Sequence, residues 1–197
     1  MNYLTSDTHF DHANIIRYCN RPYSSAEEMN KALISNWNSV VKPSDTVYFL
    51  GDFAFRNHEE FLRRLNGRKI LIPGHHDQGL EGLHHYFDEV TPLKQVTIDG
   101  QALVLCHYPM REWPGRDRGA WHLHGHSHGK NLPSEGKQWD VGVDVNNYRP
   151  LSLTQIRAIM ANRTETRRLM VFDPYDQGQL KVKYARKIRT VAPRLSR

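Results

Sequence analysis

Histidines are numerous in this sequence and lie close together along it. The chain has 197 residues and 12 histidines. Imidazole titrates near neutral pH, and it is the side chain that most often binds metal ions in proteins. Metal chemistry is therefore the first function to consider. Eight of the histidines form three groups, which are His75-His76, His84-His85 and the set His122, His124, His126 and His128.

Aspartates and histidines follow several short apolar segments that we expect to be strands. Asp7 and His9 follow residues 3–5, and Asp52 follows residues 46–50. In open α/β sheets ligands bind beyond the carboxyl ends of the strands, so we expect these loops to converge. The other ligand-type residues follow residues 69–72 and 101–106 or lie within residues 123–128, and they are His75, His76, Asp77, His107, His126 and His128.

These residue types suit the hydrolysis of a phosphate ester. Two divalent ions about 3.5–4 Å apart neutralise phosphoryl oxygens and acidify a water molecule, and they need a carboxylate that bridges them. Side chains alternate along an extended segment, so Asp7 and His9 lie on one side of theirs. A single Asp-x-His is more often a surface turn than a ligand pair. The five segments together, mostly at strand ends, favour a metal site.

The elements that hold these residues alternate between strands and helices. Residues 46–50 and 69–72 are apolar runs typical of buried strands. Ser25 begins a capping box, and the apolar residues behind it recur every four positions, which predicts a helix that ends before Pro43. Further strands are expected at residues 3–5, 141–145, 171–172 and 180–184, and further helices at residues 57–66 and 152–160.

A hairpin is expected in the middle of the chain. Asp99-Gly100 lies between residues 95–98 and residues 101–106, both of which favour strands. An Asp-Gly pair in that position is a strong hairpin signal. Strands alternating with helices indicate an α/β fold, and the hairpin makes its sheet mixed rather than purely parallel.

Five segments occur in one order along residues 7–128: Asp7-Thr8-His9, Gly51-Asp52, Gly74-His75-His76-Asp77, His107 and Gly125-His126-Ser127-His128. Together they resemble the calcineurin-like metallophosphoesterases. Residues 140–144 and 148–150 are similar to a small bacterial and phage-like branch of that family. The resemblance implies an α/β fold in the form of a four-layer αββα sandwich with two mixed β-sheets. The metal ions would lie at the loop ends of the sheets.

The resemblance also implies a role for each of these residues. It implies two divalent transition-metal ions, manganese first, with Ni, Co, Zn or Fe as alternatives. Asp52 would bridge them. His76 would be the general acid that protonates the leaving oxygen, and Asp77 would orient His76. The first ion would be held by Asp7, His9, Asp52 and His128, and the second by Asp52, His75, His107 and His126.

Two positions depart from the family pattern. His75 stands where the family motif Gly-Asn-His-Asp has Asn, so a softer and larger imidazole replaces an amide oxygen. His75 could bind the second ion or swing away from it. Phe55 stands where many relatives have the second Asp of Gly-Asp-x-x-Asp, so the usual partner of His76 is missing.

Other residues have simpler interpretations. His124 is expected to pack or hydrogen-bond behind the site. Trp113, Trp121 and Trp139 are expected to pack in loops, with stacking on a nucleobase as the alternative. The surface histidines would be His12, His58, His84, His85 and His122, and the candidate phosphate-binding arginines are Arg21, Arg111, Arg116, Arg118 and Arg149.

The net charge of +6 is unevenly distributed. Residues 151–197 carry 11 Lys and Arg against 3 Asp and Glu, a net of +8, and residues 1–150 carry 16 against 18, a net of −2. We expect one domain over residues 1–184 and a basic tail over residues 185–197. The tail is either a solvated surface or a site that attracts a polyanion such as nucleic acid.

Composition favours a cytoplasmic protein. No apolar run approaches the length of a membrane span, and the first residues do not have the pattern of a signal peptide. The two cysteines, Cys19 and Cys106, are too few for a disulfide framework and are expected to be reduced.

The leading hypothesis is hydrolysis of a phosphodiester by a metal-bridging hydroxide, with His76 as the general acid. The substrate would be small and nucleotide-like, for example a cyclic nucleotide or an RNA-end cyclic phosphate. The alternative is a phosphomonoester such as a nucleotide or a phosphoprotein. Another class is a nucleic-acid-binding module that uses the basic tail and has a degenerate metal site. A structural zinc site is a third class, but such sites usually have four closed ligands rich in Cys.

Overall fold

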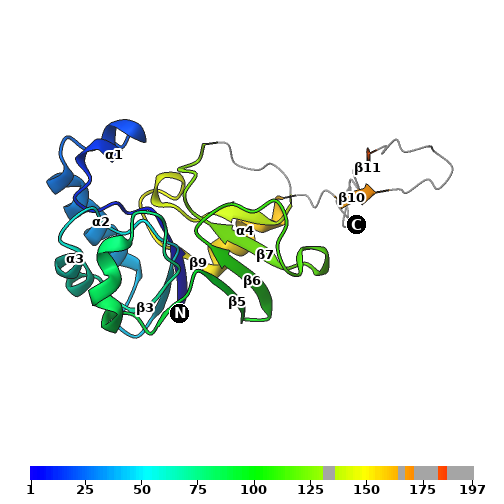
Figure 1. Cartoon of the computed structure of the whole chain (residues 1–197), viewed down its shortest axis with the longest axis horizontal. Helices are drawn as coiled ribbons and strands as arrows, with labels where there is room; N and C mark the ends of the chain where they lie inside the picture. The colour runs from blue at the N-terminus through cyan, green and yellow to red at the C-terminus, as the bar shows by residue number, and fades with distance from the viewer. Residues whose placement is uncertain (131–135, 164–166, 171–181, 186–197) are drawn as a thin grey trace, which may run out of the picture.

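The computed structural model describes residues 1–130, 136–163, 167–170 and 182–185 (Figure 1). The last two segments form the antiparallel pair β10 (Arg167–Met170) and β11 (Val182–Ala185). The expected closing hairpin is therefore present, with its first strand earlier than predicted. Residues 171–172 of that prediction lie outside the described residues, as do residues 186–197 of the predicted tail.

The first sheet has the strand order β4-β3-β2-β1-β9. Its strands are β1 (Asn2–Thr5), β2 (Thr46–Phe49), β3 (Arg68–Leu71), β4 (Glu89–Val90) and β9 (Leu151–Ser152). β1 to β4 pair in parallel, and β9 runs antiparallel to β1. The loops after β1, β2 and β3 therefore leave from the same edge of this sheet. The sequence predicted these three strands but not the two-residue strands β4 and β9.

The second sheet has the order β5-β6-β7-β8. Its strands are β5 (Leu93–Ile98), β6 (Gln101–Cys106), β7 (Trp121–His124) and β8 (Gln138–Asp140). β5 and β6 form the predicted hairpin, with Asp99 at φ 47° and Gly100 at φ 77°, as a tight hairpin turn requires. β6, β7 and β8 pair in parallel, so this sheet is also mixed.

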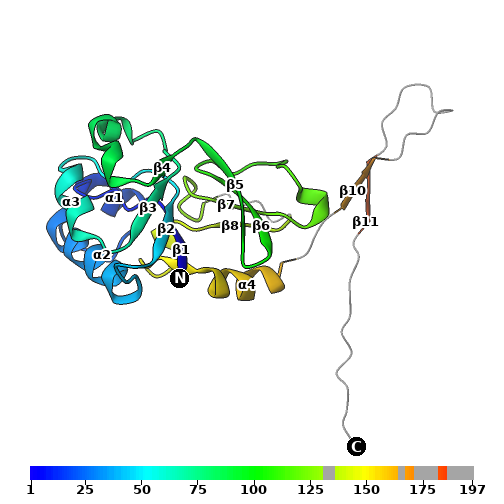
Figure 2. The same cartoon turned by 90° about the horizontal axis from the view of Figure 1, so that it is seen from below.

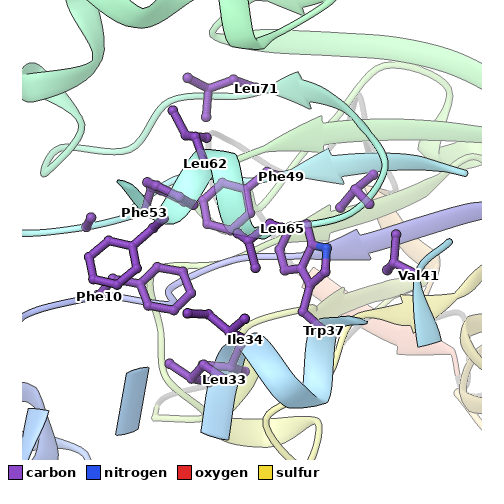
Figure 3. Packing of buried hydrophobic residues seen from close by; sticks show 14 of the residues in the cluster. Phe10, Leu33, Ile34, Trp37, Val41, Phe49, Phe53, Leu62, Leu65 and Leu71 are labelled. Carbon is purple, nitrogen blue, oxygen red and sulfur yellow. The ribbon is translucent and has the colours of Figure 1, made fainter. Parts of the chain in front are cut away.

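Helices cover the face of the first sheet that points away from the second sheet (Figures 1 and 2). Trp37 and Leu33 project from the longest helix and pack with Phe49 of β2 and with Phe10 (Figure 3). That helix begins at Ser25, whose side chain accepts a hydrogen bond from the Glu28 N–H, as the capping pattern predicts. These elements are α1 (Ala13–Tyr18), α2 (Ala26–Val40), α3 (His58–Arg64) and the 3-10 segment η1 (Gln78–Tyr86).

The other face of the first sheet packs against the second sheet. Leu4 from the first sheet, Leu105 from the second and Ile156 from α4 (Leu153–Ala161) are all fully buried in this core. The outer face of the second sheet is covered more thinly, by Trp113 and the segment that contains η2 (Arg116–Arg118). The expected α/β class with two mixed sheets is confirmed.

The two sheets meet at the carboxyl ends of their strands. Ser6, just after β1, forms a parallel bridge with Gly142, just after β8. The Val143 N–H also donates to the Ser6 carbonyl at 3.1 Å. Loops from both sheets therefore converge at one edge of the molecule.

One predicted strand is wrong. The sequence predicted a strand at residues 141–145, but the strand is β8 and residues Val143–Val145 form the 3-10 turn η3. The Asn146 side-chain amide donates to the carbonyls of Asp140 and Gly142 at 2.9 and 2.7 Å, which folds the chain back on itself. Within the described residues, no helix is long and apolar enough to cross a membrane.

Candidate metal centre

Asp52 lies at the centre of the site, just after β2, and its side chain is buried. Its Oδ2 atom is 3.6 Å from His9 Nε2. The same oxygen is 3.5 Å from His107 Nε2 and 3.5 Å from His75 Nδ1. One carboxylate oxygen therefore faces three imidazole nitrogens from three different loops.

The seven residues predicted as ligands come together in two adjacent groups. Within each group, one potential ligand atom per residue lies within 4.8 Å of all the others. Asp52 connects the groups because His9, which faces its Oδ2, belongs to the other one. The first group is Asp7, His9 and His128, and the second is Asp52, His75, His107 and His126.

The backbone at these residues adopts a conformation that side chains rarely tolerate. Five of the seven have a positive φ in the left-handed region. Non-glycine residues are uncommon there, and clusters of them are typical of functional sites. The loops therefore hold these side chains inward at some cost in backbone energy. The five are Asp7 at 58°, His9 at 48°, Asp52 at 59°, His126 at 68° and His128 at 47°.

Glycines allow the loops to approach the ligand-type side chains. A Cβ atom on Gly74 would lie less than 3.0 Å from both Asp52 and His107. A Cβ atom on Gly125 would meet the side chains of Ser6 and Asp7 at similarly short distances. Glycine at these two motif positions is therefore required by packing.

Backbone and carboxylate groups orient two of the imidazoles. His107 Nδ1 lies 2.6 Å from the Leu50 carbonyl, which leaves its Nε2 facing Asp52. His128 Nδ1 lies 2.7 Å from Asp144 Oδ2. Such second partners fix the orientation and the tautomer of metal-binding imidazoles.

Arg21 holds Asp144 in place. Its Nε and Nη2 atoms each donate to Asp144 at 2.8 Å, and Nη2 also donates to the Asp7 carbonyl at 2.7 Å. Arg21 is only 4% exposed, so its proposed role as a phosphate-binding residue is wrong. No local pattern predicts a role for Asp144, because 123 residues separate it from Arg21. Asp144 and His128 also form a further ligand-type group with Cys19.

Burial and pairing move the pKa values of the site in opposite directions. Burial raises the pKa of Asp7 to about 7. Burial would also raise the pKa of Asp52, but the His107 imidazole 3.5 Å away lowers it below its usual value. Burial would lower the pKa of His128, but the hydrogen bond that its ring donates to Asp144 raises it to about 10. Positive charge near these buried carboxylates therefore favours their ionised form.

The donor set fits divalent metal ions. His9 Nε2 and His107 Nε2 are buried and have no hydrogen-bond partner among the described residues. Buried polar atoms without partners are rare, and a cation at these nitrogens would satisfy both. Imidazole with carboxylate is a donor set that suits Mn, Fe, Co, Ni and Zn.

His76 lies beside the two groups without belonging to either of them. Its ring is exposed and lies 5.4 Å from the His9 ring, between centroids, and its backbone N–H donates to Asp52 Oδ1 at 3.0 Å. Asp77 has a different role from the predicted one. Its carboxylate accepts hydrogen bonds from the backbone of Asp52, Phe53 and Gly74 at 2.7–2.8 Å, so it fixes the loops rather than the His76 ring.

Two further histidines test the sequence interpretation. His122 was predicted to be a surface residue, and this is wrong, because it is fully buried between Val104 and the backbone of Tyr108 and Met110. His124 is buried behind the site with its Nδ1 atom 3.0 Å from the Gly125 carbonyl, as predicted.

The tryptophans pack within the protein. Trp113 is buried and donates to the Ala120 carbonyl at 2.9 Å. Trp121 and Trp139 are half-buried, and arginine side chains lie over their rings. Trp113 therefore packs in a loop as predicted, whereas Trp121 and Trp139 belong to strands β7 and β8 rather than to loops.

Fold and site together define an α/β protein with two facing mixed sheets and an Asp/His cluster of the metal-binding type where the strand ends meet. The chain is 42% identical over 165 residues to the uncharacterized protein MJ1445 of Methanocaldococcus jannaschii, a match that covers 78% of this chain and 88% of that protein. The chain therefore belongs to the family of MJ1445. No family model matches it.

Solved structures are similar to this chain. The protein of unknown function AQ665 from Aquifex aeolicus is 31% identical, with a TM-score of 0.65 over 81% of this chain and 98% of that chain. A novel archaeal phosphodiesterase is 21% identical, with a TM-score of 0.44 over 72% of this chain and 81% of that chain.

Proposed function

We propose that this protein is a calcineurin-like metallophosphoesterase that hydrolyses a phosphodiester with two divalent metal ions. The observation that carries the proposal is the position of Asp52 between two ligand-type groups. Its Oδ2 atom faces His9 of one group at 3.6 Å and His75 and His107 of the other at 3.5 Å. A structural metal site needs one closed set of ligands, whereas a shared carboxylate is what a binuclear site needs.

The residues divide into those that hold the ions and those that act on the substrate. Asp7, His9, Asp52 and His128 would hold one ion, and Asp52, His75, His107 and His126 would hold the other. Bound ions would supply positive charge to the phosphoryl oxygens and would acidify a water molecule. Arg21 and Asp144 fix the direction of His128, and Leu50 fixes that of His107.

His76 is the residue proposed to protonate the leaving oxygen. Its ring is exposed to solvent at the edge of the cluster and contacts the rings of His9 and His75, with centroids 5.4 and 3.8 Å away. A general acid must reach the substrate and must not be occupied as a metal ligand. The exposure of His76 and its place outside both ligand-type groups support this role.

The test combines metal content with hydrolysis. The purified protein is stripped with a chelator, reloaded separately with Mn, Mg, Ni, Co or Zn, and assayed on an aryl phosphodiester and an aryl phosphomonoester. We expect hydrolysis of the diester only after reloading. Undiminished hydrolysis by the stripped protein would contradict the proposal.

Asp52→Asn tests the shared carboxylate, because it keeps the shape of the side chain and removes its charge. We expect it to lower bound metal more than any other single ligand change and to abolish hydrolysis. The matched control is Asp88→Asn, since Asp88 is an exposed aspartate paired with Arg68 on the surface. Full metal content and activity in Asp52→Asn would show that Asp52 does not bridge two ions.

A further inference from the structure

Three large aromatic side chains are exposed among the described residues, and all three lie around the metal centre. They are Tyr18, Phe55 and Tyr108, with 54%, 52% and 44% of their surface exposed. Single exposed apolar residues are ordinary, but a concentration of them around a polar site indicates a ligand surface. None of these residues has a role in holding metal.

Two of them lie on the side of the site that contains His9. The Phe55 ring stacks on His12, with centroids 4.9 Å apart and 13° between the ring planes. His12 in turn lies 5.5 Å from His9 and 6.3 Å from His76. Tyr18 meets His12 edge-on at 6.4 Å. This stack, which we call the Phe55 platform, therefore reaches from the first ligand group to the surface.

Tyr108 lies against the other ligand group. Its ring is 4.8 Å from the His126 ring and 4.9 Å from the His107 ring, both edge-on. It is also 6.5 Å from the His75 ring. The Phe55 platform and Tyr108 thus border different ligand groups, and Asp52 lies between those groups. A phosphate bound by metal ions between the two ligand groups would have an aromatic surface on each side.

Positive charge accompanies the Phe55 platform. The Arg56 guanidinium lies 5.7 Å from the centre of the Phe55 ring, and that of Arg17 lies 5.5 Å from the centre of the Tyr18 ring. Both arginines are exposed. Aromatic rings interleaved with arginines are the usual means of binding single-stranded nucleic acid, because bases stack on the rings and phosphates pair with the guanidinium groups.

We propose that the substrate is a single-stranded nucleic acid, with the base on one side of the cleaved phosphate stacked on the Phe55 platform and the base on the other side stacked on Tyr108. This inference rests on the proposed phosphodiesterase function and names its substrate class. A cyclic nucleotide has one base and would use only one of the two surfaces.

Binding is measured first on metal-loaded His76→Ala protein, which is expected to retain metal and to hydrolyse substrates with poor leaving groups slowly, so that the result does not depend on hydrolysis. The ligands are a thymidylate pentanucleotide and an abasic deoxyribose-phosphate pentamer of the same length and charge. We expect the protein to prefer the thymidylate ligand. Phe55→Leu and Tyr108→Leu, which keep apolar bulk and remove the ring, should each reduce that preference about 5- to 100-fold.

Conservative variants separate stacking from a change in folding. Phe55→Trp and Tyr108→Phe keep an aromatic face and should keep the preference for the thymidylate ligand. If the protein binds both pentamers equally, or if the leucine variants keep the preference of the parent, the inference is wrong.

Hydrolysis is then measured on metal-loaded protein with the same pentamers and with an aryl phosphodiester. Aryl diester hydrolysis without base-dependent binding would leave the proposed function in place and overturn only the nucleic-acid inference. Base-dependent binding with no metal-dependent hydrolysis of any ester would overturn the proposed function instead.

Discussion

At the scale of single residues, the side chains of the site differ in their exposure. Asp52, His9 and His107 are buried, whereas His75, His76 and His126 are exposed. Because Asp77 binds backbone N–H groups, no carboxylate is assigned to orient the His76 ring. The proposed role of His76 therefore rests on the position of its ring beside that of His9.

His76→Ala should retain metal and lose rate on substrates with poor leaving groups, by about two to four orders of magnitude. Nitrophenolate leaves without being protonated, so aryl esters should lose much less. Kinetics on an aryl diester and an alkyl diester, with metal content measured in parallel, check this prediction. An equal loss on both substrates would argue against a general acid.

His75→Asn should raise manganese-supported activity and manganese content at the second ligand group. An amide oxygen is a harder ligand than imidazole and suits Mn better. His75 Nδ1 lies 3.5 Å from Asp52 Oδ2, and the side chain is 43% exposed, so the asparagine has room. Metal binding and turnover are measured with Mn and with Ni on the parent and on His75→Asn. Identical metal content and turnover in the two proteins would refute the prediction.

At the scale of elements, the strands of the second sheet depend on buried histidines. His122 of β7 lies with Nδ1 3.0 Å from the Val104 carbonyl of β6, and its Nε2 accepts from the Met110 N–H at 3.1 Å. A neutral ring satisfies both contacts, whereas a proton on Nε2 would face the Met110 N–H and would have only the Tyr108 carbonyl, 3.2 Å away, as an acceptor. Burial accordingly lowers the pKa of His122 to about 4.

This pKa predicts loss of stability in acid. Unfolded His122 takes up a proton near pH 6.5, while folded His122 stays neutral down to about pH 4, so stability is complete above pH 6.5 and falls between these values. The loss is about 3 kcal/mol for this residue. His122→Gln keeps a donor and an acceptor but does not titrate. Urea unfolding at several pH values between 7.5 and 4 gives the free energy of unfolding of both proteins. This free energy should fall less with decreasing pH in the variant than in the parent, and an equal fall in both would reject the prediction.

At the scale of the whole molecule, the ligand-type residues join the two sheets. Asp7, His9, Asp52 and His75 follow strands of the first sheet, whereas His107, His126 and His128 follow strands of the second. An ion bound between them would link the two halves of the inter-sheet core. Metal binding should therefore stabilise the entire fold and not only the loops.

Metal should raise the melting temperature by about 5–10 °C when its free concentration is a hundred times its Kd. Thermal unfolding of stripped and reloaded protein measures this shift. Asp52→Asn should show a much smaller shift, and Asp88→Asn should behave like the parent. A melting temperature that does not respond to metal in the parent would mean that the sheets are not joined in this way.

The sequence by itself determined the local features of this protein. Asp99-Gly100 specified its hairpin, Ser25 and Ser152 specified helix starts, and the apolar runs before Asp7 and Asp52 specified strands. Five of the seven predicted ligands lie shortly after an apolar run, and parallel strands bring their ends to one edge. These signals act over a few residues, so they can be read without knowledge of packing.

Only the tertiary structure decided the features that depend on how the two sheets pack. The pairing of Arg21 with Asp144 spans 123 residues, and no local pattern marks it. β4 and β9 have two residues each, too few to show a periodic pattern. His122 is buried, Asp77 binds the backbone, and Phe55 and Tyr108 gather around the site because of neighbours that are distant in the chain. Burial and contact are properties of the packed molecule, so a single sequence cannot reveal them.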